Sequence, residues 1–422
     1  MPDTPSICIV TPHHLANNPR VIKEAETLAE GGGDVTVIHG CYDNALAEED
    51  EFIALGSKWK AIPVKWRRLP QSLASQAGLR LARLSMYFRK YPSLRVAARA
   101  EHVSIPALSA AARQVKSELY IGHTPSGLCA AAAGARHAGA LLGFDAEDYH
   151  ATETDAVVRN PRRRRGIETI EQRLLPLCAS FTASTIQIAE EYAATRGTVL
   201  PNVFFNAFPR SMGPLHKPEH RPLDSTPRRL YWFSQTIGPG RGLEKLLVIL
   251  GKCKIDCDLY IRGNPEGEFL RTLEQIAVLA RFRGKMYFLR RQPASEMARL
   301  CSGYDLGLAL ELSHPGNRDI CLTNKIFIYL LAGLPIAYTP TRAQSAFCGS
   351  LSKLTVRIDL DDPVTSAREL EAYFRSPARQ ERAREDAWLA GQSIYCRDTD
   401  EARFISVIEN ALQTPPCPIP RL

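Results

Sequence analysis

Polar and apolar positions separate most sharply in the last third of the chain. Two polar residues, Asn324 and Lys325, precede an apolar run that extends to Leu331. A run that is apolar on every side predicts a buried helix. Three flanking residues fit the ends of this helix as N-cap, C-terminal glycine and stop, namely Thr323, Gly333 and Pro335. We therefore expect a helix from 324 and a short strand at 336–339.

Asn324 and Lys325 stand in the first turn of this predicted helix. Unpaired backbone N–H groups and the positive end of the helix dipole favour an anion such as a phosphate at that place. The pattern leaves a second interpretation open, in which Lys325 only extends its ammonium group from the helix end into water.

The first half of the chain alternates apolar strands with helices. A strand at 6–10, a loop, a helix at 21–30 and a strand at 35–39 make a βαβ unit. Further segments continue the alternation, with strands at 119–122, 140–144, 180–185 and 198–200 and helices ending at 137, 178 and 195. The proline-rich stretch 201–227 has no periodicity and predicts an interdomain connection.

The second half repeats the same alternation. Strands are expected at 229–233, 257–262, 285–289, 306–310 and 354–358, and helices at 243–250, 266–280, 294–302, 363–374, 377–389 and 399–412. The tail 415–422 is expected to be disordered. The predicted fold is α/β, with two Rossmann-like, doubly wound domains facing a cleft. We expect an N-terminal domain at 1–205, a linker at 206–227, a C-terminal domain at 228–398, and a final helix and tail at 399–422.

Composition places the chain among ordinary cytoplasmic proteins. It has 422 residues, of which 45% are hydrophobic and 23% charged. No stretch approaches the roughly 20 apolar residues of a membrane-spanning helix, and the first residues lack the pattern of a signal peptide. The 11 cysteines are odd in number and scattered, which favours free thiols over disulfides or a zinc site.

Positive charge is concentrated in one segment. Residues 58–116 carry an excess of 12 positive charges, more than the net +8 of the whole chain. Within this segment, 79–88 interleaves leucines and aromatic residues with arginines. Such a helix can lie on the inner face of an anionic membrane, or it can be a solvated helix that covers the domain. No recognition motif for nucleic acid accompanies the charge, so we expect no nucleic-acid partner.

Four segments in the expected order carry a resemblance to a known family: 17–38, 200–203, 234–244 and 324–335. The chain resembles the nucleotide-sugar glycosyltransferases of the GT-B fold, most closely the retaining enzymes of family 4. The dinucleotide fingerprint G-x-G-x-x-G is absent from the first loop, which argues against a classical NAD enzyme.

The resemblance implies a UDP- or GDP-sugar donor on the C-terminal domain, no required metal, and an acceptor on the N-terminal domain. The acceptor would be a small molecule, a glycan or a lipid-linked glycan. Arg241 matches the family's phosphate-binding lysine, and Gln235 or Thr236 falls near its companion arginine. The predicted donor contacts are Gln235, Thr236, Arg241, Asn264, Gln292, Asn317, Asn324 and Lys325.

One position departs from the family. Five residues before its glycine, the donor helix of the family carries an acid that holds the nucleotide ribose, and Ile328 stands there in this chain. The family's other acid falls near Asp319 or Ile320. Asp319, with Asn317, is therefore the predicted contact for the donor sugar.

On the acceptor side, His13 or His14 in the first loop and His123 at a later strand end are expected to face the cleft. An inverting reaction would need one of the histidines, or Asp145, Glu147 or Asp148, as a base. The resemblance to the family implies a retaining reaction, which would need no strong protein base. His13, His123 and Asp319 are the predicted catalytic residues.

Two other functions remain open from the sequence. One is a GT-B-like epimerase of sugar nucleotides, which would need an acidic cluster and no acceptor site. The other is a catalytically degenerate, transferase-like partner subunit, which Ile328 suggests.

Overall fold

The computed structural model describes residues 4–66, 71–88, 92–219 and 221–422. These residues form two compact units. The first runs to Phe204 and takes in Glu401–Leu422 at the end of the chain, and the second is Phe205–Asp400. The final helix therefore belongs to the N-terminal unit, because its Phe404 ring packs against Phe204 with centroids 5.1 Å apart.

The N-terminal unit is built on a parallel sheet, which has seven strands in the part of the unit that is described. The strands are β1 (Ser6–Thr11), β2 (Asp34–Gly40), β3 (Lys60–Val64), β4 (Leu119–His123), β5 (Leu141–Ala146), β6 (Cys178–Ala183) and β7 (Asn202–Val203). They lie in the order β3-β2-β1-β4-β5-β6-β7. The central strands are long apolar runs because helices cover both faces of a parallel sheet.

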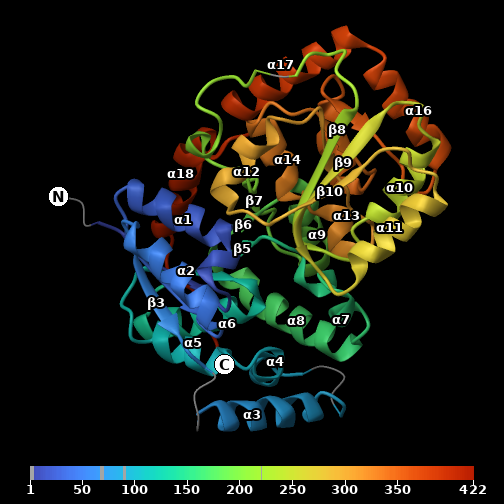
Figure 1. Ribbon diagram of the computed structural model, residues 1–422. Coiled ribbons are helices and arrows are strands. Elements are labelled where there is room, and N and C mark those ends of the chain that lie inside the picture. Colours follow the sequence, from blue (N-terminus) through green and yellow to red (C-terminus); the bar gives the residue numbers. More distant parts are fainter. Residues whose placement is uncertain (1–3, 67–70, 89–91, 220) are drawn as a thin grey trace. The chain divides into compact units, whose positions relative to one another are not determined.

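Helices cover both faces of this sheet (Figure 1). They are α1 (Pro19–Glu30), α2 (Asn44–Leu55), α3 (Gln71–Ser85), α4 (Leu94–Glu101), α5 (Ile105–Ala112), α6 (Thr124–Ala138), α7 (Asp155–Val158), α8 (Pro161–Leu174), α9 (Ile186–Arg196) and α18 (Glu401–Leu412). Val21 of α1 and Ile408 of α18 share a core with Ile9 and Ile121. On the other face, Gly134 of α6 lies so close to the Tyr120 ring that an added Cβ would come within 2.6 Å of it.

The C-terminal unit repeats the plan with six parallel strands among the residues described. They are β8 (Arg228–Ile237), β9 (Cys257–Pro265), β10 (Met286–Leu289), β11 (Leu306–Ala309), β12 (Ile336–Tyr338) and β13 (Thr355–Arg357). Their order is β10-β9-β8-β11-β12-β13. The predicted fold class, α/β with two Rossmann-like domains, is confirmed.

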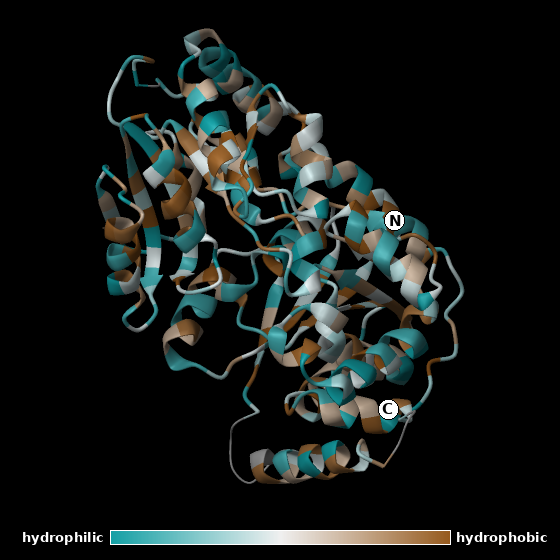
Figure 2. Cartoon of the chain, turned by 90° about the vertical axis from the view of Figure 1, so that its right-hand side faces the viewer, coloured by the Kyte–Doolittle hydropathy of each residue, from teal (hydrophilic) through white to brown (hydrophobic). Residues whose placement is uncertain are grey.

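The helices of this unit are α10 (Leu243–Lys252), α11 (Phe269–Leu279), α12 (Ala294–Cys301), α13 (Gly316–Ile320), α14 (Asn324–Leu331), α15 (Arg342–Ser350), α16 (Pro363–Phe374) and α17 (Pro377–Ser393). Figure 2 shows apolar residues gathered on the strands and on the inner sides of the helices. The predicted helix at 324–331 is α14, with Gly333 in the left-handed conformation after it, at φ +67°.

Contacts of Tyr329 and of two glycines, Gly307 and Gly391, fix α14 in place. The Tyr329 hydroxyl lies 3.2 Å from the carbonyl oxygens of Tyr231 and Leu308, on β8 and β11. Gly307 of β11 makes room for the ring, since an added Cβ would lie 2.7 Å from it. On the other side, Gly391 of α17 touches the backbone of Leu330. The last turn of α14 is thereby held between the sheet and α17.

The structure differs from the predicted elements at several places. No strand forms at 198–200, where Val199 and Leu200 are exposed; β7 follows Pro201 and has only two residues. Strand β8 continues to Ile237, so Gln235 and Thr236 belong to a strand and not to a loop. The sequence pattern also missed six of the described helices, namely α2, α4, α5, α7, α13 and α15. The tail expected to be disordered is described, and Ile419 in it is buried.

The predicted basic helix at 79–88 is part of α3, which begins earlier, at Gln71. Four of the basic residues on which that prediction relied lie outside the described residues: Arg67, Arg68, Arg89 and Lys90. Among the residues described, no helix is long and apolar enough to cross a membrane.

The contact between Gly391 and α14 makes a testable prediction. A Cβ at residue 391 would lie 2.1 Å from the Leu330 carbonyl oxygen, and neither backbone can move without shifting a helix. We expect Gly391→Ala to lower the free energy of unfolding by about 1–3 kcal/mol in urea titrations. Gly349→Ala on α15 is the matched control, because a Cβ there meets nothing within 4 Å. An equal loss in both variants would contradict this packing.

Candidate functional site

Each sheet has one point at which the strand order reverses. In the N-terminal unit it lies between β1 and β4, and in the C-terminal unit between β8 and β11. Ligands of open parallel sheets bind beyond the carboxyl ends of the strands at this point. The predicted site residues should therefore lie near these two points.

In the C-terminal unit, the carboxyl ends of β8 and β9 carry three of the predicted donor contacts. Gln235 and Thr236 are exposed at the end of β8, beyond a bulge that follows Phe233. Thr236 is paired in register with Asn264 of β9, which is also exposed. The structure therefore brings Gln235, Thr236 and Asn264 together at one edge.

The loop 238–242 follows and leads into α10. Gly240 and Gly242 have φ values of +72° and +81°, a conformation that glycine adopts without strain. Gly242 is the N-cap of α10, so the unpaired N–H groups of that helix open at the loop. Arg241 is half-buried between the two glycines. The Arg318 guanidinium donates to the Gly240 carbonyl at 2.7 Å and braces the loop.

Lys325 is buried, with 7% of its surface exposed, so its ammonium group does not extend into water. Its Nζ lies 3.4 Å from Glu311 Oε1 and donates to Thr323 Oγ1 at 3.1 Å. Thr323 occupies the N-cap position, but its side chain accepts no helix N–H. Burial and the nearby Arg241 guanidinium lower the pKa of Lys325, while Glu311 acts in the opposite direction. Lys325 and Arg241 thus lie close enough to influence each other.

Glu311 is a site residue that the sequence analysis missed. It follows β11 at the reversal point, and its side chain is about as buried as that of Lys325. An acid directly after an apolar strand was the available signal. Ile328, one turn along α14, is buried in the apolar core and supplies no polar group. Glu311 is therefore the carboxylate that stands at the start of α14.

The other predicted donor contacts are more dispersed. Asn324 is half-buried beside Lys325 at the start of α14. Asn317 is buried in α13. Asp319 accepts a hydrogen bond from the Arg342 backbone N–H at 3.0 Å, so its carboxylate holds the start of α15. Gln292 is exposed after β10, the outermost strand, and lies two strands away from β8.

In the N-terminal unit, the loop after β1 holds two histidines with different surroundings. The His13 side chain is exposed. His14 is fully buried, with its Nδ1 2.6 Å from Asp50 and its Nε2 accepting from the backbone N–H groups of Tyr42 and Asp43. Both ring nitrogens of His14 are therefore occupied, and it fastens the loop.

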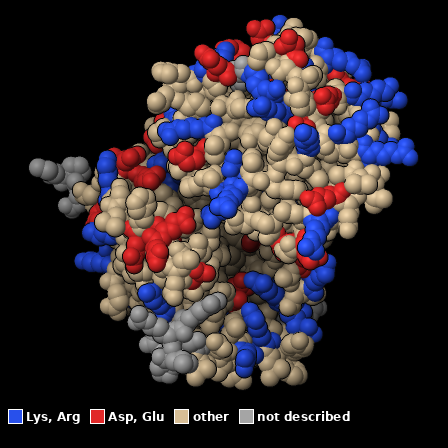
Figure 3. Space-filling model, viewed as in Figure 1, with Lys and Arg blue, Asp and Glu red and all other residues tan. Residues whose placement is uncertain are grey.

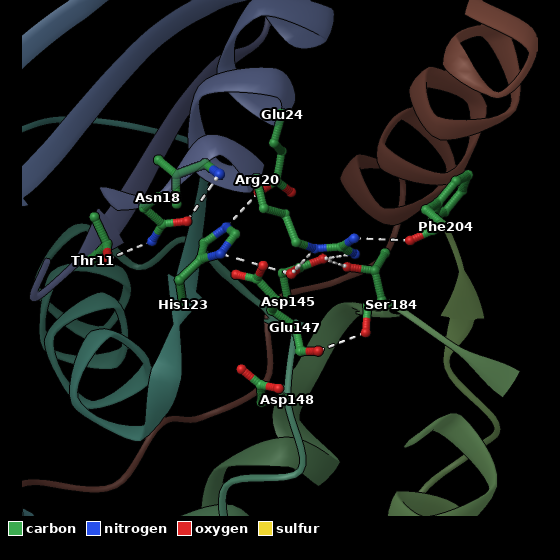
Figure 4. A network of polar contacts seen from close by, with 12 residues as sticks. Thr11, Asn18, Arg20, Glu24, His123, Asp145, Glu147, Asp148, Ser184 and Phe204 are labelled. Carbon is green, nitrogen blue, oxygen red and sulfur yellow. Dashed lines mark hydrogen bonds and ion pairs between the residues drawn. The ribbon is translucent and has the colours of Figure 1, made fainter. Parts of the chain in front are cut away.

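A closed network of charges lies beneath the reversal point between β1 and β4 (Figure 4). Arg20 Nε and Nη2 donate to the two carboxylate oxygens of Asp145 at 2.6 and 2.7 Å, and its Nη1 donates to the Phe204 carbonyl at 2.8 Å. The His123 ring contacts Glu24 through Nε2 and lies 3.7 Å from Asp145 through Nδ1. Thr182 donates to Asp145 at 2.5 Å.

Burial and neighbouring charges act in opposite directions on the pKa values of Asp145 and His123. Burial alone would raise the pKa of Asp145, but Arg20 outweighs it and the pKa lies below its usual value. Burial alone would lower the pKa of His123, but Glu24 and Asp145 raise it above the usual value. His123 is 2% exposed and lies between two carboxylates that favour its protonated form. These contacts suit it to hold the strand ends in place.

A second histidine pair lies after β5. His150 Nδ1 is 2.7 Å from Glu153 Oε2, and its ring is buried. Burial alone would lower the pKa of His150, but the hydrogen bond and charge of Glu153 raise it to about 9. Glu147 and Asp148, the other acids considered as bases, are half-buried in the same segment, and the Ser184 hydroxyl donates to the Glu147 carbonyl at 2.6 Å.

Across the described ranges, no cluster of three or more His, Cys, Asp or Glu side chains is arranged to hold a metal ion. The candidate binding groups are the cations and backbone N–H groups of the C-terminal unit and, in the N-terminal unit, the histidines of the loop after β1.

No protein-family model matches the sequence, and no curated protein matches it either. Solved structures do match the fold. A glycosyltransferase from Rickettsia africae aligns at a TM-score of 0.67 and 8% identity, over 98% of this chain and 100% of that one. Sucrose-phosphate synthase from Thermosynechococcus elongatus aligns at 0.68 and 10% identity, over 96% and 98%. HepE from Anabaena, solved with UDP-glucose, aligns at 0.65 and 11% identity, over 96% and 99%. The chain therefore has the GT-B fold.

The His150 pair predicts a dependence of stability on pH. Because its pKa is raised to about 9, the stabilisation from His150 is complete below the unfolded pKa of about 6.5 and is lost as the pH rises through 9. We expect this loss to be about 3 kcal/mol in urea titrations, and to be absent in His150→Gln. His137→Gln, at an exposed position on α6, is the control and should keep the wild-type slope. A parallel slope in His150→Gln would refute the charge assigned to this ring.

Proposed function

We propose that the protein is a glycosyltransferase that moves a hexose from a UDP- or GDP-sugar to an acceptor hydroxyl, with retention at the anomeric carbon. The observation that carries this proposal is the placement of two cations around the reversal point between β8 and β11, with Arg241 in the loop that enters α10 and buried Lys325 in the first turn of α14. A diphosphate leaving group needs positive charge and N–H donors aimed at it while the glycosidic bond breaks.

In this proposal the donor lies along the carboxyl edge of the six-stranded sheet. The diphosphate binds Arg241, Lys325 and the N–H groups at the start of α10, and these groups replace a metal ion. The nucleotide is held by polar side chains at the strand ends and at the start of α14, namely Gln235, Thr236, Asn264, Gln292 and Asn324. The presence of UDP-glucose in HepE, which shares the fold, supports a nucleotide sugar as the ligand.

The ribose requires a different acceptor from the one the family uses, since Ile328 has none to offer. We assign this role to Glu311, whose carboxylate reaches the start of α14 from the adjacent strand. Its Oε1 faces Lys325, and a carboxylate has further lone pairs for ribose hydroxyls. Asn317 and Asp319, both on α13, are the proposed contacts of the donor sugar, and Asp319 also accepts a hydrogen bond from the start of α15.

On the N-terminal unit, the exposed His13 is the proposed contact of the acceptor. In a retaining transfer the departing phosphate takes the acceptor proton, so His13 orients the hydroxyl and no strong base is needed. His123 acts as a positioning residue through the network that fixes β4 and β5. The acceptor class is a small molecule, a glycan or a lipid-linked glycan, reached from the cytoplasm by peripheral contact with an anionic membrane.

Calorimetry with UDP, GDP and their hexose conjugates tests donor binding. We expect one nucleotide series to bind and Arg241→Gln to weaken it by about 10- to 100-fold, because a charged hydrogen bond is lost. Arg271→Gln, an exposed arginine on α11 that pairs with Glu268, is the matched control and should bind as the wild type does. If no nucleotide sugar binds to the wild type, the transferase and epimerase functions both fail and the partner-subunit hypothesis gains.

The role of Glu311 is tested by comparing UDP with an analogue that lacks both ribose hydroxyls, or the guanosine equivalents if GDP is the ligand. We expect the wild type to prefer the intact ribose by about 10-fold or more, and Glu311→Gln to abolish this preference. Because both ligands carry the same phosphates, a change at Lys325 alters both affinities equally and leaves their ratio unchanged.

An unchanged ratio in Glu311→Gln would refute the assignment of Glu311, whereas UDP binding itself would still support the donor site.

A further inference from the structure

Helix α3 packs on the N-terminal unit through the face that carries Ala82 and Met86. Ala82 and the following Met86 form a small apolar cluster with Ala100 of α4. The Arg83 guanidinium donates to the Ala100 carbonyl at 3.0 Å and adds a polar anchor. These contacts fix which side of α3 faces the protein.

The opposite face of α3 is apolar as well. Its residues are spaced by three or four positions, so they form one line along the helix and the turn after it. Four of them are Leu73, Leu81, Leu84 and Phe88, with exposed fractions of 60%, 67%, 55% and 84%. Exposed Ala77 lies on the same line. We name these five residues the α3 outer stripe.

The line continues past Ser85 because the chain keeps turning there. The backbone N–H groups of Tyr87 and Phe88 donate to the carbonyl oxygens of Leu84 and Ser85, at 3.0 and 3.2 Å. Figure 2 shows brown, apolar residues along α3 at the lower edge of the view, and Figure 3 shows uncharged atoms along the same edge. Several exposed leucines in one line are uncommon on a soluble surface and mark an interaction site.

Positive charge flanks the stripe. Arg80 is exposed beside it, and the Arg162 guanidinium lies 3.7 Å from the centre of the Tyr87 ring. No acidic residue occurs between 71 and 88. The single acid between 58 and 116, Glu101, is buried and paired with Arg163 at 3.4 Å. The stripe therefore has cations beside it, and segment 58–116 contributes no exposed acid.

We propose that the α3 outer stripe docks on the surface of a membrane that contains anionic lipids. The leucines and Phe88 enter the boundary between headgroups and acyl chains, and Arg80 and Arg162 bind lipid phosphates. A stable protein interface takes about 20–30 residues on each side, whereas the stripe is one helix wide and has five. An interfacial helix needs only an apolar face and flanking cations, which α3 has.

This inference names the surface and the mode of the membrane contact proposed above. It rests on α3 alone and does not depend on donor binding, so the two can fail separately. It also differs from adsorption by charge, because buried apolar side chains keep their contribution in high salt, which screens the arginines.

Sedimentation with vesicles tests the proposal. We expect the wild type to bind vesicles of phosphatidylcholine with phosphatidylglycerol, and Leu81→Ser/Leu84→Ser to bind roughly tenfold more weakly for each leucine removed. The matched control is Val278→Ser/Leu279→Ser on α11, two residues that are 77% and 82% exposed, which should bind as the wild type does. Since all four residues are exposed, the unfolding temperatures should stay the same.

The electrostatic part is tested with Arg80→Gln. We expect it to weaken binding to vesicles with phosphatidylglycerol about fivefold and to leave binding to pure phosphatidylcholine unchanged. Failure of the wild type to bind vesicles, or equal binding by the leucine variant, would overturn the proposal. So would a dimer that the leucine substitutions convert to a monomer without loss of lipid binding, because the stripe would then be a subunit interface.

Discussion

Parallel pairing of the strands is the constraint on which the rest of the structure depends. Every hydrogen-bonded strand pair among the described residues is parallel, so all strands of a sheet end at the same edge. Each connection must return across a helix, which buries both faces and leaves polar side chains room only at that edge. The order reverses once in each sheet, and there two neighbouring connections turn away from each other. Arg241, Lys325 and Glu311 lie around one of these places, whereas Gln292, Asn317 and Asp319 are dispersed.

The two reversal points use buried charge in different ways. In the N-terminal unit, Arg20, Asp145 and His123 satisfy one another, and removing one partner would leave an uncompensated charge. This network is buried and joins α1 to the ends of β4 and β5. In the C-terminal unit, Lys325 and Glu311 are separated by 3.4 Å and Arg241 stands nearby, which leaves cationic capacity for a ligand. In the proposed function, the first site holds its shape and the second accepts an anion.

The sequence predicted long, periodic elements and failed where the outcome depends on distant contacts. Helix α16 was predicted with its observed ends, because Asp362 caps it and Pro363 begins it. The prediction of a strand at 198–200 was wrong because a short run of β-favouring residues forms a strand only where its side chains are buried, and Val199 and Leu200 are exposed. The pairing of Lys325 with Glu311 joins two elements across a crossover, and no local pattern shows it. The leucines of α3 were visible in the sequence, but only packing against Ala100 shows which of them face outward.

The buried ammonium group of Lys325 has a consequence for proton uptake. Burial and Arg241 favour its neutral form in the unliganded protein. A bound diphosphate would favour the charged form again, since two negative charges would stand beside it. Ligand and proton would then bind with positive coupling, each strengthening the other by the same factor. The affinity for a nucleotide sugar held at α14 would then depend on pH, although its two esterified phosphates carry no group that titrates near neutral pH.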